Sequence, residues 1–247
     1  MHGIGTLINC ATILVGTGLG IAVKGGLPQR LQDTIMHGVA LAVMFIGIGG
    51  ALSGLLALEG GALGTQYTMM MVLSLVLGAL TGELLDIDTG LEKLGGWVKR
   101  KVPKKLTGST FVEGFVTASM LFCVGAMAVV GSLEDGLNGD YSILAAKATI
   151  DGISSLVFAT SLGIGVGFSV LPLFIYQGGI TLLAQAIKPY LTDELVSQMS
   201  CVGSILIFAI GINMLFGKKI KVANLLPAIF MPIIFALIKT VWPGFPV

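Results

Sequence analysis

Charge is scarce in this chain. Only 11% of its 247 residues are charged, whereas 55% are hydrophobic, and the mean hydropathy is +0.96. The charged residues lie almost entirely in the joins between long apolar stretches, and one join, from Asp86 to Lys105, holds a large share of them. A soluble chain of this length would carry charge on every exposed helix face. The pattern therefore excludes an ordinary soluble protein and predicts an all-α polytopic helical membrane protein, with residues 1–247 forming a single integral domain.

Residues that build disulfide frameworks, metal sites and catalytic centres are also rare. The three cysteines, Cys10, Cys123 and Cys201, lie far apart and deep in apolar stretches, which argues against disulfides and metal sites. The chain has two histidines and contains neither a Gly-x-Ser-x-Gly nor a His-Glu-x-x-His sequence. A net charge of +1 is too small to indicate nucleic-acid binding. We therefore expect no enzymatic activity, no cofactor, no metal and no nucleic-acid partner.

Long apolar stretches dominate what is present. A helix needs about 20 residues to cross the hydrocarbon core. Eight such stretches can be drawn, with boundaries at about 3–23, 31–52, 67–85, 111–131, 142–168, 171–187, 195–216 and 222–241. The fifth and sixth run together, and Pro172 is the expected break because proline lacks a donor and disfavours helix in the preceding residue. If Pro172 only kinks the helix, the count falls to seven. No signal-peptide pattern opens the chain, so the first stretch is expected to remain a span.

The joins alternate in charge. Basic residues collect on the cytoplasmic side of membrane proteins. The odd joins are basic, with Lys24 and Arg30 in the first, Lys93, Lys99, Arg100, Lys101, Lys104 and Lys105 in the third, and Lys218, Lys219 and Lys221 in the seventh. The even joins are acidic or near neutral, with Glu59 in the second, Glu134, Asp135 and Asp140 in the fourth, and Lys188 set against Asp193 and Glu194 in the sixth. Both termini are predicted to lie outside the cytoplasm.

The third join, at about 88–105, has the pattern of an amphipathic helix. Leu91, Leu94, Trp97 and Val98 fall on one helical face, with basic residues around the others. Such a helix lies in the membrane interface, where its basic groups meet anionic lipid and Pro103 ends it. The alternative is a solvated basic linker.

The chain resembles itself at a fixed offset. Sliding it by 164 positions (191 − 27 = 164) pairs residues 3–50 with 167–214 without a gap, and Ile46, Gly47 and Ile48 then meet Ile210, Gly211 and Ile212. We expect repeat A at about 3–85, central helices at about 111–168 and repeat B at about 171–241. Five crossings separate the starts of the two copies, so the repeat is predicted to be inverted, as is common in secondary transporters. Chance similarity between glycine-rich apolar helices is the alternative.

Glycine is abundant, with 36 residues. Many glycines stand four apart inside the spans, as do Gly16 and Gly20, or Gly163 and Gly167, and close helix packing is the expected reason. The alternative is that glycine-rich breaks unwind a helix and expose backbone groups to a binding site. Neither cluster follows a strand or carries the lysine-hydroxyl ending of a nucleotide-binding loop.

A few polar residues interrupt the apolar stretches. Lys147 and Asp151 stand four apart on one helical face, with Ser154 and Ser155 following. Ionisable groups inside a membrane are costly and commonly functional. The alternative is that Lys147 extends to the interface and Asp151 only pairs with it. Asn9 and Asn213 are amides within the first and seventh stretches, and each either binds substrate or bridges helices. The predicted solute or ion pathway consists of Asn9, Lys147, Asp151, Ser154, Ser155 and Asn213.

Several segments together resemble a known family. They are Gly5 to Asn9, Phe122 to Ala128 followed by Asp135 to Leu137, and Lys147 with Asp151 and Gly152 ahead of Gly163 to Val166. They are similar to the bacterial multi-spanning membrane family named domain of unknown function 554, over essentially the whole chain. The resemblance implies a multi-pass protein of the bacterial inner membrane, and the family brings no substrate with it.

Two functions are compatible with these patterns. The first is a secondary transporter or permease for a small solute or ion, which works by alternating access around the inverted repeat. The second is a non-transporting membrane scaffold that uses small-residue helix faces and the basic interfacial helix. The expected partners are the lipid bilayer, a small solute or ion, and further copies of the same chain in a homo-oligomer.

Overall fold

The computed structural model describes residues 2–24, 28–59, 62–104, 107–123, 126–187 and 191–242. Lys105 and Lys188, which contribute to the charge pattern above, lie outside these ranges. The chain forms two compact units, each built from two segments of the sequence. Unit 1 comprises Met1–Ala40 and Thr89–Tyr190, and unit 2 comprises Leu41–Asp88 and Leu191–Val247. The units do not coincide with the two predicted repeat copies, and the expectation of one integral domain stays a prediction.

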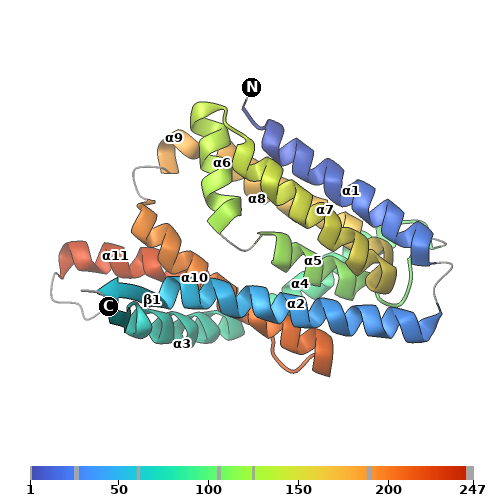
Figure 1. Cartoon of the computed structure of the whole chain (residues 1–247), viewed down its shortest axis with the longest axis horizontal. Coiled ribbons are helices and arrows are strands. Elements are labelled where there is room, and N and C mark those ends of the chain that lie inside the picture. Colours follow the sequence, from blue (N-terminus) through green and yellow to red (C-terminus); the bar gives the residue numbers. More distant parts are fainter. Residues whose placement is uncertain are drawn as a thin grey trace. The chain divides into compact units, whose positions relative to one another are not determined.

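Every described secondary-structure element of unit 1 is a helix. Its elements are α1 (Ile4–Lys24), residues 29–40 of α2 (Gln29–Leu55), most of α4 (Ile87–Lys101), α5 (Phe111–Cys123), α6 (Ala126–Asn138), α7 (Ser142–Leu162), the 3₁₀ helix η1 (Gly163–Ser169), α8 (Val170–Leu182) and the short α9 (Ala184–Ile187). Helices α1 and α7 lie side by side (Figure 1).

Glycines bring α1 and α7 unusually close. A Cβ atom added at Gly16 would lie 2.1 Å from the carbonyl oxygen of Gly152, and one at Gly20 would lie 2.2 Å from that of Leu156. No larger residue fits at either position without moving a backbone. The small residues therefore serve close helix packing here, which is the interpretation that their spacing favoured. Because contacts advance in the same direction along both helices, α1 and α7 are parallel.

The chain reverses direction between α7 and α8. A Cβ atom added at Gly167 would lie 3.1 Å from Cγ2 of Thr17 on α1. Nearer the start of α1, Asn9 contacts Gln177 of α8. Helix α8 is therefore antiparallel to α1, whereas α7 is parallel to it. The reversal starts at Gly163, whose φ of 74° is accessible to glycine at little cost. The expectation that Pro172 marks the break is wrong. Pro172 lies in the first turn of α8, where its missing N–H leaves no helical hydrogen bond unmade.

Unit 2 combines helices with one hairpin. It contains residues 41–55 of α2 (Gln29–Leu55), the strands β1 (Leu56–Glu59) and β2 (Ala62–Thr65), α3 (Thr68–Leu85), α10 (Asp193–Phe216), the 3₁₀ helix η3 (Val222–Phe230) and α11 (Met231–Val241). The strands are antiparallel, with Leu56 opposite Thr65 and Glu59 opposite Ala62. Glycines again set the packing, since a Cβ atom at Gly82 would lie 1.8 Å from the carbonyl oxygen of Asn224 at the start of η3.

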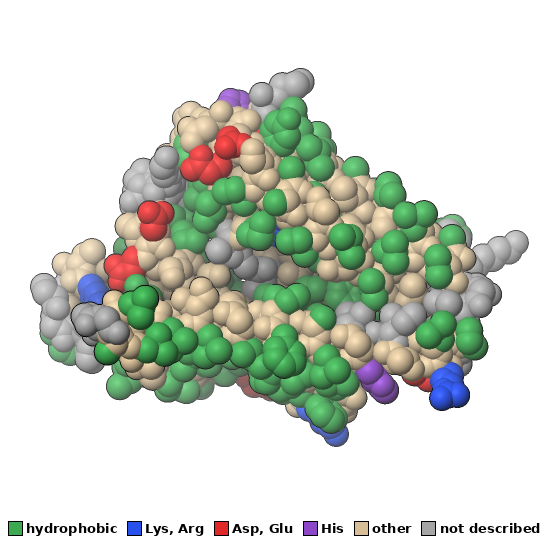
Figure 2. All heavy atoms as spheres, viewed as in Figure 1, with side chains coloured by type: hydrophobic (Ala, Val, Ile, Leu, Met, Phe, Trp, Pro, Cys, Tyr) green, Lys and Arg blue, Asp and Glu red, His purple; other side chains and the backbone are tan. Residues whose placement is uncertain are grey.

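The membrane class follows from helix length, composition and surface. Five described segments are long and apolar enough to cross a bilayer, and a sixth is counted if α5 and residues 127–138 of α6, inclined at 62°, form one span. Large apolar side chains are exposed on these helices, among them Leu84 of α3 and Ile175 of α8. Figure 2 shows hydrophobic side chains spread over the face in view, including along α1 and α7. The structure is that of an all-α polytopic protein, and the expected count of seven or eight crossings stays a prediction.

Helix α4 forms within the third join, as its pattern predicted. Its first two residues belong to unit 2 and the rest to unit 1. Val98 and Val102, which follows the helix, are buried against Phe111 and Phe115 of α5. Trp97 is 51% exposed, and the ammonium of Lys101 lies 5.8 Å from the centre of its ring. The buried edge is thus narrower than the predicted apolar face. The exposed remainder has the mixed apolar and basic character of an interfacial helix.

Candidate functional site

A polar cluster lies inside unit 1, where α1, α7 and α8 meet. Helix α1 presents Asn9 on its inner face, α7 presents Lys147 and Asp151 one turn apart, and α8 presents Gln177. All four side chains are buried. Each helix contributes them by its 3.6-residue period, which keeps residues three or four apart on the same face.

The centre of the cluster is an ion pair between Lys147 and Asp151. The Nζ atom of Lys147 binds Oδ2 of Asp151, and the two side chains are only 7% and 8% exposed. The ammonium also lies 6.0 Å from the ring centre of Phe122 on α5, in cation–π range. A buried charge is tolerated only when it is paired and hydrogen-bonded. The two residues therefore depend on each other to remain ionised inside the protein.

Two amides extend the cluster away from the ion pair. Asn9 donates from Nδ2 to Oδ2 of Asp151 over 3.0 Å and to Oε1 of Gln177 over 3.4 Å. The carboxylate fixes the orientation of both amides, because a flipped Asn9 would place its oxygen against the carboxylate. A flipped Gln177 would likewise place two N–H groups against each other. This orientation leaves Oδ1 of Asn9 and Nε2 of Gln177 buried with no hydrogen-bond partner among the described residues.

The site therefore offers one free acceptor and one free donor beside a carboxylate and an ammonium. Both amide side chains are fully buried. Such an arrangement can bind a small polar molecule or ion, or exchange a proton at Asp151, away from bulk water. The described residues contain no group of three or more His, Cys, Asp or Glu side chains placed to hold a metal ion.

The other predicted pathway residues have different surroundings. Ser155 is fully buried and donates to the carbonyl oxygens of Ile13, at 3.2 Å, and Gly152, at 2.9 Å, so it bridges α7 to α1. Ser154 is half-buried on the same helix. Asn213 belongs to unit 2, where its side chain donates to the carbonyl oxygen of Ile220 and accepts from two backbone N–H groups of the turn after α10.

Two residues matter more than the sequence pattern indicated. Gln177 is visible in the sequence only as a polar residue in an apolar stretch, and the reversal at Gly163 is what carries it to Asn9. Asp135 is the second. The sequence places Asp135 in the acidic fourth join, but it lies within α6 and is fully buried. Its carboxylate accepts from the backbone N–H groups of Gly3 and Gly5, each over 3.0 Å. It thus stabilises the start of α1, where helix amides lack partners.

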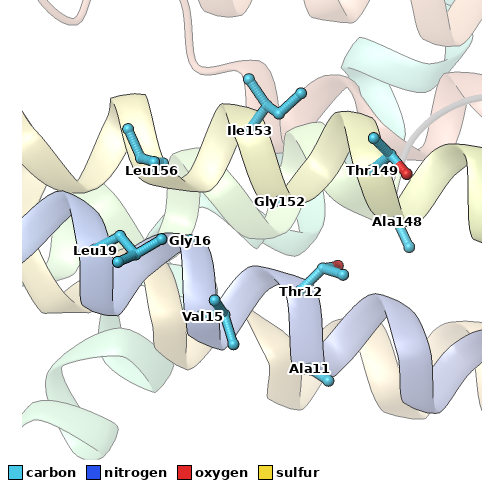
Figure 3. A pocket seen from close by; sticks show the side chains of 10 residues that line it. All are labelled: Ala11, Thr12, Val15, Gly16, Leu19, Ala148, Thr149, Gly152, Ile153 and Leu156. Carbon is cyan, nitrogen blue, oxygen red and sulfur yellow. The ribbon is translucent and has the colours of Figure 1, made fainter.

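A groove on the outer side of the α1–α7 pair is a different feature. It has a volume of about 410 Å³ and runs between side chains of the two helices (Figure 3). Its lining comprises Ala11, Thr12, Val15, Gly16, Leu19, Ala148, Thr149, Gly152, Ile153 and Leu156. None of these side chains is ionisable, so the groove lacks the chemistry of the cluster inside.

Unit 2 has a polar cluster of its own, near the ends of α3 and α10. Glu83 accepts from Lys221 and from the amide of Asn224, each over 2.6 Å. The amide oxygen of Asn224 accepts from the backbone N–H of Asp88 over 2.7 Å. Lys218 in turn pairs with the Asp88 carboxylate at 2.5 Å. The Lys218 and Lys221 side chains are about half exposed, at 51% and 55%. This cluster joins α3, the start of α4 and η3 at a solvent-accessible edge.

Apolar helices of spanning length, close glycine packing and a buried ion pair define a polytopic helical membrane protein. The chain belongs to the family described as protein of unknown function (DUF554), whose model matches residues 4–237. The resemblance found in the sequence is thereby confirmed.

Two relatives are similar over nearly their full length. The uncharacterized membrane protein YdfK of Bacillus subtilis (strain 168) is 32% identical over 228 residues, which cover 92% of this chain and 93% of YdfK. The uncharacterized protein YqgA of Escherichia coli (strain K12) is 31% identical over 242 residues, covering 97% and 98% of the two chains. No solved structure matches the chain.

Proposed function

We propose that this protein is a secondary transporter or permease that moves a small solute or ion across the bacterial inner membrane. Its binding site comprises Asn9, Lys147, Asp151 and Gln177. The observation that carries the proposal is the buried Lys147–Asp151 pair, with two oriented amides that still have free hydrogen-bonding atoms. Ionisable residues inside membrane helices commonly mark solute paths and proton relays, because a merely structural role would be served at lower cost by apolar packing.

In this proposal Asp151 is the switching group. It carries the coupling proton or cation, and Lys147 keeps it ionised until the transported species displaces the ammonium. Either event breaks the ion pair and frees Lys147 to change its partner. The paired and unpaired forms then favour different helix arrangements, as alternating access requires.

The helix boundaries support a repeated design. Helix α2 starts at Gln29 and α10 at Asp193 (193 − 29 = 164), and α3 starts at Thr68 and α11 at Met231 (231 − 68 = 163). Helix α1 starts at Ile4 and α8 at Val170 (170 − 4 = 166). All three offsets fall close to the 164 positions at which the sequence matches itself. Transporters built from inverted repeats place their site between the copies, and in this proposal Asn9 belongs to the predicted repeat A and Gln177 to the predicted repeat B.

A non-transporting scaffold is the second candidate. The exposed Trp97 and basic residues of α4 favour it, because they offer a surface for lipid or a partner. Against it, Gly16 and Gly20 are already used within the chain to pack α1 on α7. An enzymatic role has no support from the groups in the polar cluster.

Transport by purified protein in proteoliposomes tests the proposal. Currents are recorded on solid-supported membranes after jumps in proton, sodium or potassium concentration, and after addition of pooled amino acids, carboxylates or sugars. We expect a current for at least one probe, and we expect Asp151→Asn to abolish it without loss of folded protein. Asp140→Asn, which neutralises an exposed acid just before α7, is the matched control and should keep the current. An unchanged current in Asp151→Asn removes Asp151 from the mechanism, and the absence of any current favours the scaffold.

A further inference from the structure

Unpaired polar atoms are concentrated along one part of unit 1. Six buried side-chain atoms have no hydrogen-bond partner in the part of the chain that the structure describes. They are Oγ1 of Thr6, Oδ1 of Asn9, Oγ1 of Thr17, Oγ of Ser132, Nε2 of Gln177 and Oγ1 of Thr181. All six belong to α1, α6 and α8. Protein interiors seldom leave such atoms unsatisfied, and ordered water is their usual partner where protein groups are lacking.

The hydroxyl groups in this set differ from others in the same chain. A serine or threonine in a helix commonly donates to a carbonyl oxygen one turn earlier. Thr81, Ser119 and Thr149 do so here, at 2.5 to 3.1 Å. Thr6, Thr17, Ser132 and Thr181 make no such bond and are nevertheless buried. Their hydroxyls are therefore available to a partner other than their own helix.

Five of the six unpaired atoms, all except Oγ1 of Thr17 beside Gly167, lie along a path from Asp151 toward the start of α1. Asn9 and Gln177 adjoin the ion pair. One turn nearer the start of α1, Thr6 follows Gly5, whose N–H binds the Asp135 carboxylate. One further contact brings α6 and α8 to this level. A Cβ atom at Gly136, next to Asp135, would lie 2.3 Å from the carbonyl oxygen of Thr181, and Ser132 precedes Gly136 by one turn of α6.

We infer that a file of water molecules occupies this path and connects the Lys147–Asp151 pair to the end of unit 1 at which α1 begins. Asn9 and Gln177 form its inner end, Thr6, Ser132 and Thr181 line it, and Asp135 with His2 marks its mouth. Asp135 is buried, but His2, whose Nδ1 lies 3.0 Å from the Asp135 carbonyl oxygen, is exposed. The role of the file as an access route for a solute or ion rests on the proposed function, whereas the presence of water in the file is independent of it.

Cysteine accessibility tests the file without a known substrate. In a background with Cys10, Cys123 and Cys201 replaced by Ala, single variants Thr6→Cys, Ser132→Cys and Thr181→Cys are treated in proteoliposomes with the charged reagent methanethiosulfonate ethylammonium. Leu7→Cys and Leu182→Cys are depth-matched controls, since they adjoin Thr6 and Thr181 but face outward with 59% and 87% exposure. A thiol reacts as its thiolate, which requires water. We expect modification of the inner thiols at least about tenfold faster than that of the controls, measured by intact mass.

A measurement on the unmodified protein guards against variants that fail to fold. Hydroxyl radicals generated by a short X-ray pulse in ¹⁸O-labelled water mark side chains that adjoin bound water. Leu144, which packs against Gly5, and Leu173, one turn before Gln177 on α8, are fully buried; Leu206 is equally buried in unit 2, where the described residues have no unpaired buried side-chain atom. We expect ¹⁸O uptake at Leu144 and Leu173 and little at Leu206.

The outcomes separate the file from transport. Equal rates at inner and outer cysteines, together with no ¹⁸O at Leu144 and Leu173, overturn the file even if currents are present. Fast inner modification in a protein that passes no current supports the file and overturns the transport proposal. Fast modification together with a current that Asp151→Asn abolishes supports both.

Discussion

The buried ion pair predicts a specific pattern of stability in a double-mutant cycle. Asp151→Leu leaves the ammonium of Lys147 without its carboxylate, and Lys147→Met leaves the carboxylate without its ammonium. Both side chains are less than 10% exposed, so a remaining charge gains no contact with bulk water and meets only the inner end of the proposed water file. Breaking a buried pair in this way costs about 3–5 kcal/mol, because the remaining charge has lost its ionised partner inside the protein.

The double variant Lys147→Met/Asp151→Leu should be far less damaging than the two single changes added together. Replacing both charges with apolar groups of similar size is often neutral or stabilising, by about 1–4 kcal/mol. One cost remains, since Nδ2 of Asn9 loses its acceptor on Asp151, and an unsatisfied buried donor costs about 1–3 kcal/mol. The two contributions nearly cancel, so we expect the double variant to lie within about 2 kcal/mol of the wild type.

Thermal unfolding in detergent, followed by circular dichroism at a helix band, measures the cycle. For a chain of this size 1 kcal/mol corresponds to about 2–4 °C in Tm. Each single variant should therefore melt roughly 6–20 °C below the wild type, and the double variant should recover most of that loss. Lys221→Met is a matched control, because it breaks an ion pair whose side chains are 55% and 59% exposed, and its Tm should change little.

Additivity would refute this reasoning. If the double variant loses as much stability as the two single variants together, the two charges do not stabilise one another. If Asp151→Leu leaves Tm unchanged, the ammonium of Lys147 has another compensating partner, and the ion pair cannot be the centre of the site.

Three further changes test other parts of the structure. Gly16→Ala places a methyl group 2.1 Å from the Gly152 carbonyl oxygen and should lower Tm, whereas Gly18→Ala enters open space and should raise stability by up to about 1 kcal/mol; similar melting of the two variants would contradict the close packing. Hydrogen bonds from the hydroxyl and the N–H of Ser142 lower the pKa of the exposed Asp140 carboxyl. The Asp140–Ser142 contact therefore stabilises the protein fully above the unfolded-state pKa of Asp140, and this stabilisation is lost as the pH falls through the lower folded-state pKa. Amide exchange at Ser142 should thus accelerate in acid in the wild type relative to Asp140→Asn, and identical profiles would exclude the contact. Asn213→Ala removes three hydrogen bonds from the turn after α10 and should lower the free energy of unfolding by about 1–3 kcal/mol, seen as a lower Tm. It should leave any transport current unchanged, and a lost current would return Asn213 to the pathway.

Local patterns predicted the parts of the site that lie within one helix. Lys147 and Asp151 were expected on one face because they stand four apart, and they form an ion pair. The third join was expected to be an amphipathic helix, and α4 forms there. Both depend only on the helical period, which any short segment carries in its own sequence.

Contacts between distant segments could not be predicted in the same way. Asn9 was recognised as a polar residue that binds substrate or bridges helices, but its neighbours were unknown, because Asp151 and Gln177 are 142 and 168 positions away. The sequence places Asp135 in an acidic join with Glu134 and Asp140 and does not reveal that α6 extends to Asn138 and buries it. Asn213 looked equivalent to Asn9, although it completes a local turn in another unit.

The sequence by itself determined the membrane class, the helical architecture and the family, because hydropathy and composition act on every span independently of its neighbours. Only the tertiary structure decided which polar residues share an interior. The turn at Gly163 sends α8 back along α1, and the glycines at 16 and 152 bring α7 against α1 closely. The physical reason is that a buried charge or amide is satisfied by groups brought near it by packing, and packing depends on helix directions and crossing contacts that no single span encodes.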